Sequence, residues 1–317
     1  MRINFYQGPS PRNDGSAFFL LHALRRIPGV DVVHYQCHGD PRLHAKCDLN
    51  VAVDWAEDIW PTSRDFIEPR PLVYWMSDTH CSEASRRFRF DKAKRADHVY
   101  CAIWSDVSRL LAEGVAARWL PYAAEPLCFT TWDADVKADV GFVGHIGDYD
   151  GRVEFLDVMF RAFPNFHFEY NRYLELCALE MRKSKVALNH CWRRDCTNMR
   201  VFEAMATGVC LLTPVTDDLP WLKIEDGVNC LTYTTTEEAI EKVRAILKDD
   251  DRRMAIAKAG RERILTEHTY VHRALTILRD VTGDPWTVDE EAIINTIPGK
   301  GREWGERETR LPLALPL

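Results

Sequence analysis

The sequence predicts an α/β fold made of two doubly wound domains. Short apolar runs that suit strands alternate with longer amphipathic segments that suit helices, and this alternation occurs twice along the 317 residues. Strands that alternate with helices pair in parallel, because each helix carries the chain back across the sheet. A stretch without any sustained hydrophobic period separates the two alternations. We therefore expect two domains of ordinary size, each with its own sheet.

The first half of the chain starts with an apolar strand and a loop rich in glycine and proline. The amphipathic helix that follows is terminated by Pro28 and Gly29, and a later helix has Ser105 as its N-cap and Gly114 as its stop signal. The strands expected here are 2–6, 31–35, 49–54, 72–76 and 98–103, and the helices are 16–26, 83–95 and 105–113.

The second half repeats the pattern after a break at 123–138, which we expect to be an interdomain linker. The domains would then be 1–122 and 139–267, and a terminal helix and tail at 268–317 would cross back to the first domain. Ligands bind beyond the carboxyl ends of the strands in such sheets, so the cleft between the domains is the expected site. The strands expected are 140–143, 166–170, 186–190 and 209–213, and the helices are 153–163, 174–183, one opening near Thr197, 237–247, 252–266 and 271–278.

Composition excludes several classes of protein. The net charge of −7 gives no global basic field for nucleic acid or an anionic membrane. No apolar run approaches the length of a membrane span and the N-terminus has no signal-peptide pattern, so we expect a cytoplasmic protein. The ten cysteines include no C-x2-C pair, and we expect reduced thiols without a bound metal.

The segment that begins at Asp195 is the most informative part of the chain. Thr197 suits a helix N-cap, and Gly208 ends the helix before an apolar strand. The unpaired amides and positive end of a helix suit a phosphate, and Arg200 in the first turn is a charge partner for a diphosphate. Repulsion keeps the carboxylates of Asp195 and Glu203 away from phosphates, so they suit sugar hydroxyls. The segment therefore indicates a nucleotide-sugar site.

These residues resemble a known family. Two acids separated by seven residues, the second opening Glu-Ala-Met-Ala-x-Gly, form the donor-site motif of retaining GT-B glycosyltransferases. The segment 200–213 is similar to the CgeB-like (spore-maturation type) group, although the first acid is Asp195 in place of glutamate. Other segments that resemble this group are 74–80, 119–124, 139–144 with Arg152, 184–189 and 268–273.

The resemblance implies the GT-B architecture, in which two Rossmann-like domains face each other across a cleft. It also implies retaining, metal-independent transfer of a sugar from a nucleotide-diphosphate donor, without any other cofactor. The acceptor is not determined and could be a saccharide, a protein or modified DNA. The oligomeric state stays open as well. Glu203 would bind the ribose hydroxyls, and Asp195 would bind the donor sugar. The donor-site residues implied are Gly144, Arg152, Tyr170, Asn171, Thr197, Asn198, Met199, Arg200 and Glu203. The residues implied near the reaction centre are Asp78, His80 and Asp195, and the loop facing acceptor and phosphate would contain Gly8, Arg12, Asn13 and Asp14.

Two alternatives stay open. A phage-type enzyme that glycosylates hydroxymethylated DNA bases would need a basic, aromatic-edged groove, for which the basic segment 86–95 is the candidate. A non-catalytic nucleotide-sugar-binding protein is favoured only by Asp195 in place of glutamate. The Asp-x-Asp sequence from Asp133 to Asp135 lies in the expected linker and not at a strand end, so we interpret it as solvated and expect no metal site.

Overall fold

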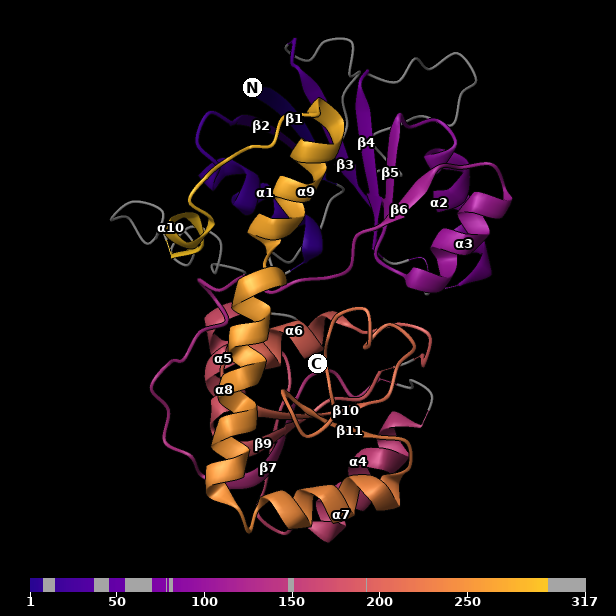
Figure 1. Cartoon of the computed structure of the whole chain (residues 1–317). Coiled ribbons are helices and arrows are strands. Elements are labelled where there is room, and N and C mark those ends of the chain that lie inside the picture. Colours follow the sequence, from indigo (N-terminus) through magenta and orange to yellow (C-terminus); the bar gives the residue numbers. More distant parts are fainter. Residues whose placement is uncertain are drawn as a thin grey trace, which may run out of the picture.

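The computed structural model describes residues 1–7, 15–36, 46–54, 70–77, 79, 82–147, 151–191 and 193–295. It shows two α/β domains, one above the other in Figure 1. Each domain contains a parallel sheet with helices on both faces. The predicted fold class is confirmed.

The first sheet has the strand order β2-β1-β3-β4-β5-β6, and every pairing is parallel. Helices α1 and α9 lie on one face of this sheet, and α2 and α3 lie on the other (Figure 1). The order reverses direction between β1 and β3, which places a ligand-binding crevice at their carboxyl ends. The strands are β1 (Arg2–Gln7), β2 (Asp31–Gln36), β3 (Leu49–Val53), β4 (Leu72–Met76), β5 (His98–Cys101) and β6 (Ala117–Trp119), and the first helices are α1 (Ser16–Arg26), α2 (Glu83–Ala93) and α3 (Trp104–Ala112).

The second sheet has the order β11-β10-β9-β7-β8, again all parallel, and its switch point lies between β7 and β9. One face packs against α5, α6 and the end of α8, and the other packs against α4 and α7. The strands are β7 (Ala138–Val143), β8 (Phe166–Glu169), β9 (Ser184–Leu188), β10 (Cys210–Pro214) and β11 (Leu231–Tyr233), and the helices are α4 (Arg152–Ala162), α5 (Leu174–Arg182), α6 (Met199–Ala206), α7 (Thr236–Ile246) and α8 (Asp250–Glu267).

The chain returns to the first domain after α8. Helix α9 (Tyr270–Thr282) lies beside α1, and the short α10 (Glu290–Asn295) packs on α9 (Figure 1). The buried guanidinium of Arg273 donates to the carbonyl oxygens of Pro121 and Tyr122, both at 2.8 Å, and Ala124 forms a β-bridge with Thr269. We call residues 121–124 and 268–273 the hinge, because both chain crossings between the domains meet there.

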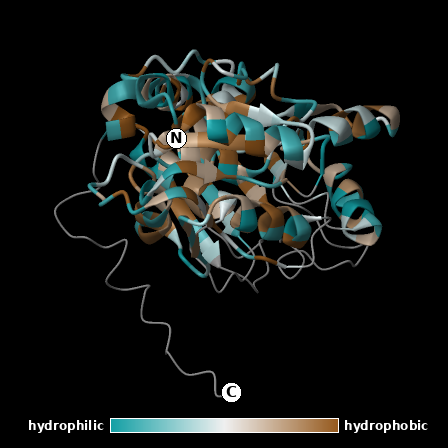
Figure 2. Ribbon diagram, turned by 90° about the horizontal axis from the view of Figure 1, so that it is seen from below, coloured by the Kyte–Doolittle hydropathy of each residue, from teal (hydrophilic) through white to brown (hydrophobic). Residues whose placement is uncertain are grey.

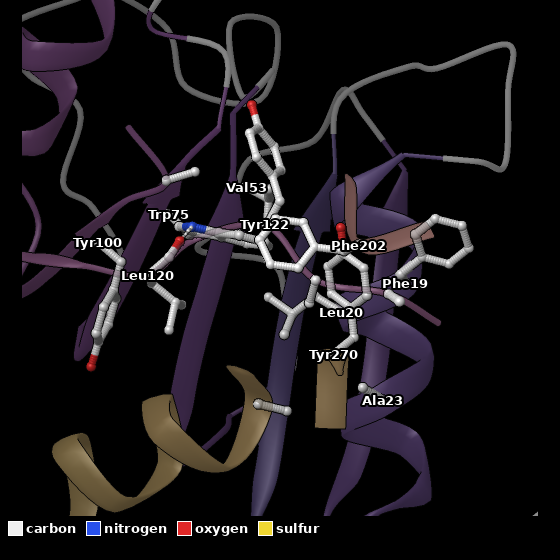
Figure 3. Packing of buried hydrophobic residues seen from close by; sticks show 14 of the residues in the cluster. Phe19, Leu20, Ala23, Val53, Trp75, Tyr100, Leu120, Tyr122, Phe202 and Tyr270 are labelled. Atoms are coloured by element: carbon white, nitrogen blue, oxygen red, sulfur yellow. Dashed lines mark hydrogen bonds between the residues drawn. The ribbon is translucent and has the colours of Figure 1, made fainter. Parts of the chain in front are cut away.

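One hydrophobic cluster continues across the hinge. Phe202 of α6 lies in the same buried cluster as Phe19 of α1 and Tyr270 of α9, and the rings of Phe19 and Tyr270 are 5.2 Å apart (Figure 3). Hydrophobic residues concentrate on the central strands and the inner faces of the helices, and hydrophilic residues on the outer turns (Figure 2). Burial of apolar surface therefore holds the two domains together at the hinge. None of the described helices is long and apolar enough to cross a membrane.

Candidate functional site in the interdomain cleft

The carboxyl edges of the two sheets face each other. Trp104 and Ser105 begin α3, just after β5 of the first sheet, and both contact the second domain. Ser105 Oγ donates to Asp195 Oδ2 at 2.7 Å, and the ring of Trp104 stacks on that of Trp221 at 5.6 Å. Loops from the carboxyl ends of both sheets therefore line the space between the domains.

Gly144 and Arg200 meet at the switch point of the second sheet. Gly144 directly follows β7, and a Cβ built on it would lie 3.9 Å from Arg200 Nη2 and 3.3 Å from the ring of Phe142. A Cβ here would therefore press against the Phe142 ring, while it would only be in ordinary van der Waals contact with the arginine. Gly144 thus leaves room beside the Phe142 ring, close to the first turn of α6.

Arg152 connects two loops of the site. Its Nη1 donates to the His145 carbonyl at 2.8 Å and its Nη2 to the His190 carbonyl at 3.0 Å. These bonds join the loop after β7 to the end of β9. The resemblance implied only that Arg152 belongs to the donor site, whereas the structure shows that its guanidinium also fixes the backbone around the crevice.

Thr197 is not the N-cap of α6, so this part of the prediction is wrong. Its amide donates to Asp218 Oδ2 at 2.9 Å, and its hydroxyl lies 2.6 Å from Asp218 Oδ1 and 2.8 Å from the hydroxyl of Thr216. The Thr197 amide, which we expected to bind phosphate, therefore already donates to the buried carboxylate of Asp218. The helix begins one residue after the actual N-cap, Asn198, whose side chain forms no cap hydrogen bond.

In the first turn of α6 the Val201 amide donates to the Asn198 carbonyl at 3.3 Å, which leaves the amide of Met199. The side chain of Asn198 forms two 3.1 Å hydrogen bonds with Asn189, which also bonds Thr213, so the preceding loop is fixed. No described residue accepts a hydrogen bond from the amide of Met199. The Met199 sulfur accepts from the Tyr270 hydroxyl, so α9 also supports this turn.

Glu203 is buried in the middle of α6 and pairs with Arg200, whose Nη1 lies 2.9 Å from Glu203 Oε2. The same nitrogen donates to the sulfur of Cys177 at 2.8 Å. A buried carboxylate is costly unless it is paired, so the arginine offsets much of the cost. The pair brings a cation and a hydrogen-bond acceptor together beside Gly144.

Asp195 lies between the domains. Arg193 Nε donates to its Oδ1 at 2.8 Å, Arg193 Nη2 donates to Oδ2, and Ser105 also donates to Oδ2. Burial alone would raise the pKa of Asp195, but the hydrogen bonds from Arg193 and Ser105 outweigh it and lower that pKa. The carboxylate is therefore ionised at neutral pH.

Tyr170 and Asn171 follow β8 at the outer end of an aromatic row. The ring of Tyr170 is 58% exposed and stacks on Phe168 at 6.2 Å, and Phe168 stacks on Phe142 at 6.3 Å. Asn171 has a positive φ of 53° and accepts a hydrogen bond from Tyr173. This exposed aromatic face lies two rings away from Phe142, next to Gly144.

Six predicted residues lie outside the described part of the chain. They are Gly8, Arg12, Asn13, Asp14, Asp78 and His80.

Ser77, which precedes Asp78 in the sequence, belongs to a buried network that the sequence did not reveal. Asp54 has a φ of 38°, and its carboxylate accepts from the Ser77 amide at 2.8 Å and from Arg89 Nε at 3.1 Å. The left-handed backbone of Asp54, just after a strand, marks this network. That conformation is visible in the structure and not in the sequence.

No group of three or more His, Cys, Asp or Glu side chains is placed to hold a metal ion in the described ranges. The aspartates of the Asp133 to Asp135 sequence lie in the chain between β6 and β7, which forms no helix or strand.

Residues 135–279 match the family described as glycosyl transferase-like. The matched range contains the whole second sheet, both acids of the motif and α9 up to residue 279. This segment is therefore similar to that family over a little under half of the chain. No curated protein sequence matches the chain.

Solved structures with the GT-B fold resemble the whole molecule. HepE from Anabaena, solved with UDP-glucose, superposes with a TM-score of 0.65 at 15% identity, covering 90% of this chain and 100% of that one. A sucrose-phosphate synthase from Thermosynechococcus elongatus gives a TM-score of 0.64 at 13% identity over 89% of this chain and 98% of that one. AviGT4, a glycosyltransferase of avilamycin A biosynthesis, gives 0.60 at 13% identity over 89% and 98%. The chain therefore has the GT-B fold.

Proposed function

We propose that the protein is a retaining, metal-independent glycosyltransferase that uses a nucleotide-diphosphate sugar and no further cofactor. The observation that carries the proposal is the pairing of half-buried Arg200 with buried Glu203 beside Gly144, at the carboxyl end of β7 and the start of α6. HepE, which shares the fold, was solved with UDP, with UDP and glucose, and with UDP-glucose. The CgeB-like subgroup and a cytoplasmic location are parts of the same proposal.

The phosphates would bind at the first turn of α6. The amide of Met199 and the positive end of the helix favour an anion there, and Arg200 adds a full charge. As the bond between sugar and phosphate breaks, negative charge grows on the leaving diphosphate. Fixed donors aimed at that charge stabilise the transition state without a metal ion.

Glu203 would accept hydrogen bonds from the ribose hydroxyls, since a carboxylate offers about four acceptor sites. Tyr170 and Asn171 would lie on the side of the base. In this arrangement the anomeric carbon points from the second domain toward the first, where the acceptor would bind.

The proton of the acceptor would pass to the leaving phosphate. The bond from the anomeric carbon to the phosphate oxygen breaks, the acceptor oxygen bonds that carbon on the same face, and a phosphate oxygen takes the acceptor proton. Glu203 and Asp195 are both ion-paired to arginines, which supports a role as acceptors of hydrogen bonds and not as acids. The configuration of the product, read from the coupling of the anomeric proton in NMR, tests retention.

The basic segment of α2 does not favour a DNA acceptor. Arg89 is buried against Asp54, Arg86 pairs with Glu83, and Lys94 pairs with Glu113 at 2.7 Å. Charges neutralised within the protein contribute little to the binding of phosphates on DNA.

Calorimetry with UDP and UDP-glucose tests the donor site. Glu203→Ala should weaken UDP binding by about 1–3 kcal/mol, the scale of hydrogen bonds to a charged group. The matched control is Glu241→Ala, an exposed acid on α7, which should bind as the wild type does. Equal affinity of Glu203→Ala and wild type, with equal melting temperatures, would remove the ribose assignment. Hydrolysis of the donor by the wild type separates an enzyme from a non-catalytic binder.

Metal independence has its own experiment. Transfer or donor hydrolysis should persist in excess EDTA, because Arg200 and the helix amides neutralise the diphosphate. Loss of activity that Mn²⁺ or Mg²⁺ restores would show that the mechanism depends on a metal ion.

A further inference from the structure

Two neighbouring residues of the first domain contact the second domain away from the hinge. Ser105 donates to Asp195, and Trp104 stacks on Trp221 with an angle of 27° between the rings. Trp104 is itself supported by Trp119, whose ring lies edge-on at 5.2 Å. A polar contact and an aromatic contact thus start from the same helix turn.

These contacts lie where they can control the opening of the cleft. Figure 1 shows α3 on one side of the molecule and the passage from α8 to α9 on the other. The hinge contacts of Arg273 and Ala124 lie on the α8–α9 side. Two domains move relative to each other by default unless their interface is large and hydrophobic. The apolar packing between these domains lies at the hinge, so contacts across the cleft from the hinge are the ones placed to control its opening.

The hydrogen bonds of Asp195 limit what else its carboxylate can bind. Arg193 donates to both carboxylate oxygens and Ser105 donates to one. These three bonds occupy most of the roughly four acceptor sites of a carboxylate. A donor sugar would compete with protein donors that are already in place.

We propose that Trp104, Ser105, Asp195 and Trp221 form an interdomain latch, and that Asp195 is a positioning residue. It supports transfer by holding the cleft closed over the donor, and it does not bind the donor sugar. Trp221, which is 64% exposed, provides the apolar half of the latch. This inference rests on the proposed function for its kinetic consequence, but the latch itself is a property of the two domains.

Binding and kinetics of matched variants test the role of Asp195. Asp195→Ala and Ser105→Ala should each lower kcat by about ten- to a hundredfold, the effect of losing a hydrogen bond to a charged group. The double variant should be no slower than the slower single variant, because both remove the same contact. Ser105→Thr keeps a hydroxyl and should restore kcat, and the exposed neighbour Ser108→Ala is the control.

The ratio of the Kd values for UDP and UDP-glucose separates the two roles. A latch residue leaves this ratio unchanged in Asp195→Ala, because the sugar is not its partner. A specific loss of UDP-glucose affinity in Asp195→Ala that is absent in Ser105→Ala would overturn the proposal.

Small-angle scattering tests the latch independently of any nucleotide. Asp195→Ala and Trp221→Ala should increase the radius of gyration of the unliganded protein, and Ser108→Ala should not. An unchanged radius in both latch variants would overturn the latch. If the wild type binds none of a panel of nucleoside diphosphates and nucleotide sugars but these variants still open, the proposed function is contradicted and the latch is supported.

Discussion

The stability of the hinge should depend on pH through His268. Its side chain is buried between Arg263 and Arg273, and its backbone carbonyl accepts from Ala124. Arg273 Nη2 donates to Nδ1 at 3.0 Å, and Nε2 lies 3.0 Å from the Leu222 carbonyl oxygen. The neutral ring with a proton on Nε2 satisfies both contacts. A second proton, on Nδ1, would point at a guanidinium.

The pKa of His268 sets the size of the effect. Burial, together with the charges of Arg273 and Arg263, lowers this pKa from the ordinary 6.5 to about 3. Below pH 6.5 His268 is protonated in the unfolded chain but stays neutral in the folded chain. The contribution to stability is therefore complete above pH 6.5 and is lost as the pH falls toward 3. At pH 5 the loss is about 2 kcal/mol, since each pH unit in this window costs about 1.4 kcal/mol.

Denaturant unfolding of the wild type and His268→Gln at pH 7 and pH 5 measures this contribution. Glutamine can accept from Arg273 and donate to Leu222 but does not titrate in this range. The stability gap between the two proteins should shrink by about 2 kcal/mol on going from pH 7 to pH 5. His22 and His34 also have lowered pKa values, near 3 and 4, so the wild type alone would lose more than this. The same gap at both pH values would refute the reasoning.

Two further substitutions test the packing and the polar support of the second domain. Gly260→Ala should lower the free energy of unfolding by about 1–3 kcal/mol, although alanine has the better helix propensity. The reason is that its Cβ would lie 2.5 Å from the Asn229 carbonyl oxygen. Thermal unfolding checks this, and a rise in melting temperature would contradict it. Asp218→Asn should lower the free energy of unfolding by a similar amount and weaken UDP binding in calorimetry, because an amide nitrogen would face the donors of Thr197. The control is Asp217→Asn, at an exposed position. Equal stability and equal UDP affinity of the two variants would show that Asp218 does not support the site.

Local sequence patterns predicted most of the elements of the fold. The helix at 16–26 and the strand at 72–76 agree with α1 and β4 residue for residue, because clear apolar periods and strong stop signals define them. The strands β6 and β11 have only three residues each, and α10 has six. Segments this short carry too little hydrophobic period to be recognised, so none of the three was expected.

The contacts of the site depend on partners that are distant in sequence. Asp218 lies 21 residues from Thr197, and Ser105 lies 90 residues from Asp195. Spacing along the chain identified a loop, a helix start and two acids in one segment. It could not show that a carboxylate beyond β10 would take the Thr197 amide, or that a serine of the first domain would reach Asp195.

The buried polar groups explain which residues remain for a substrate. A loop at the carboxyl edge of a sheet must satisfy its own backbone and side-chain groups before it can present others to a ligand. Asp218 and Asn189 do this for the loop before α6, and Arg152 does it for the loop after β7. What this support leaves toward the cleft is the amide of Met199 and the approach over Gly144. Both suit the nucleotide diphosphate that we propose as the donor, so the polar network that fixes the loops also supports the proposed site.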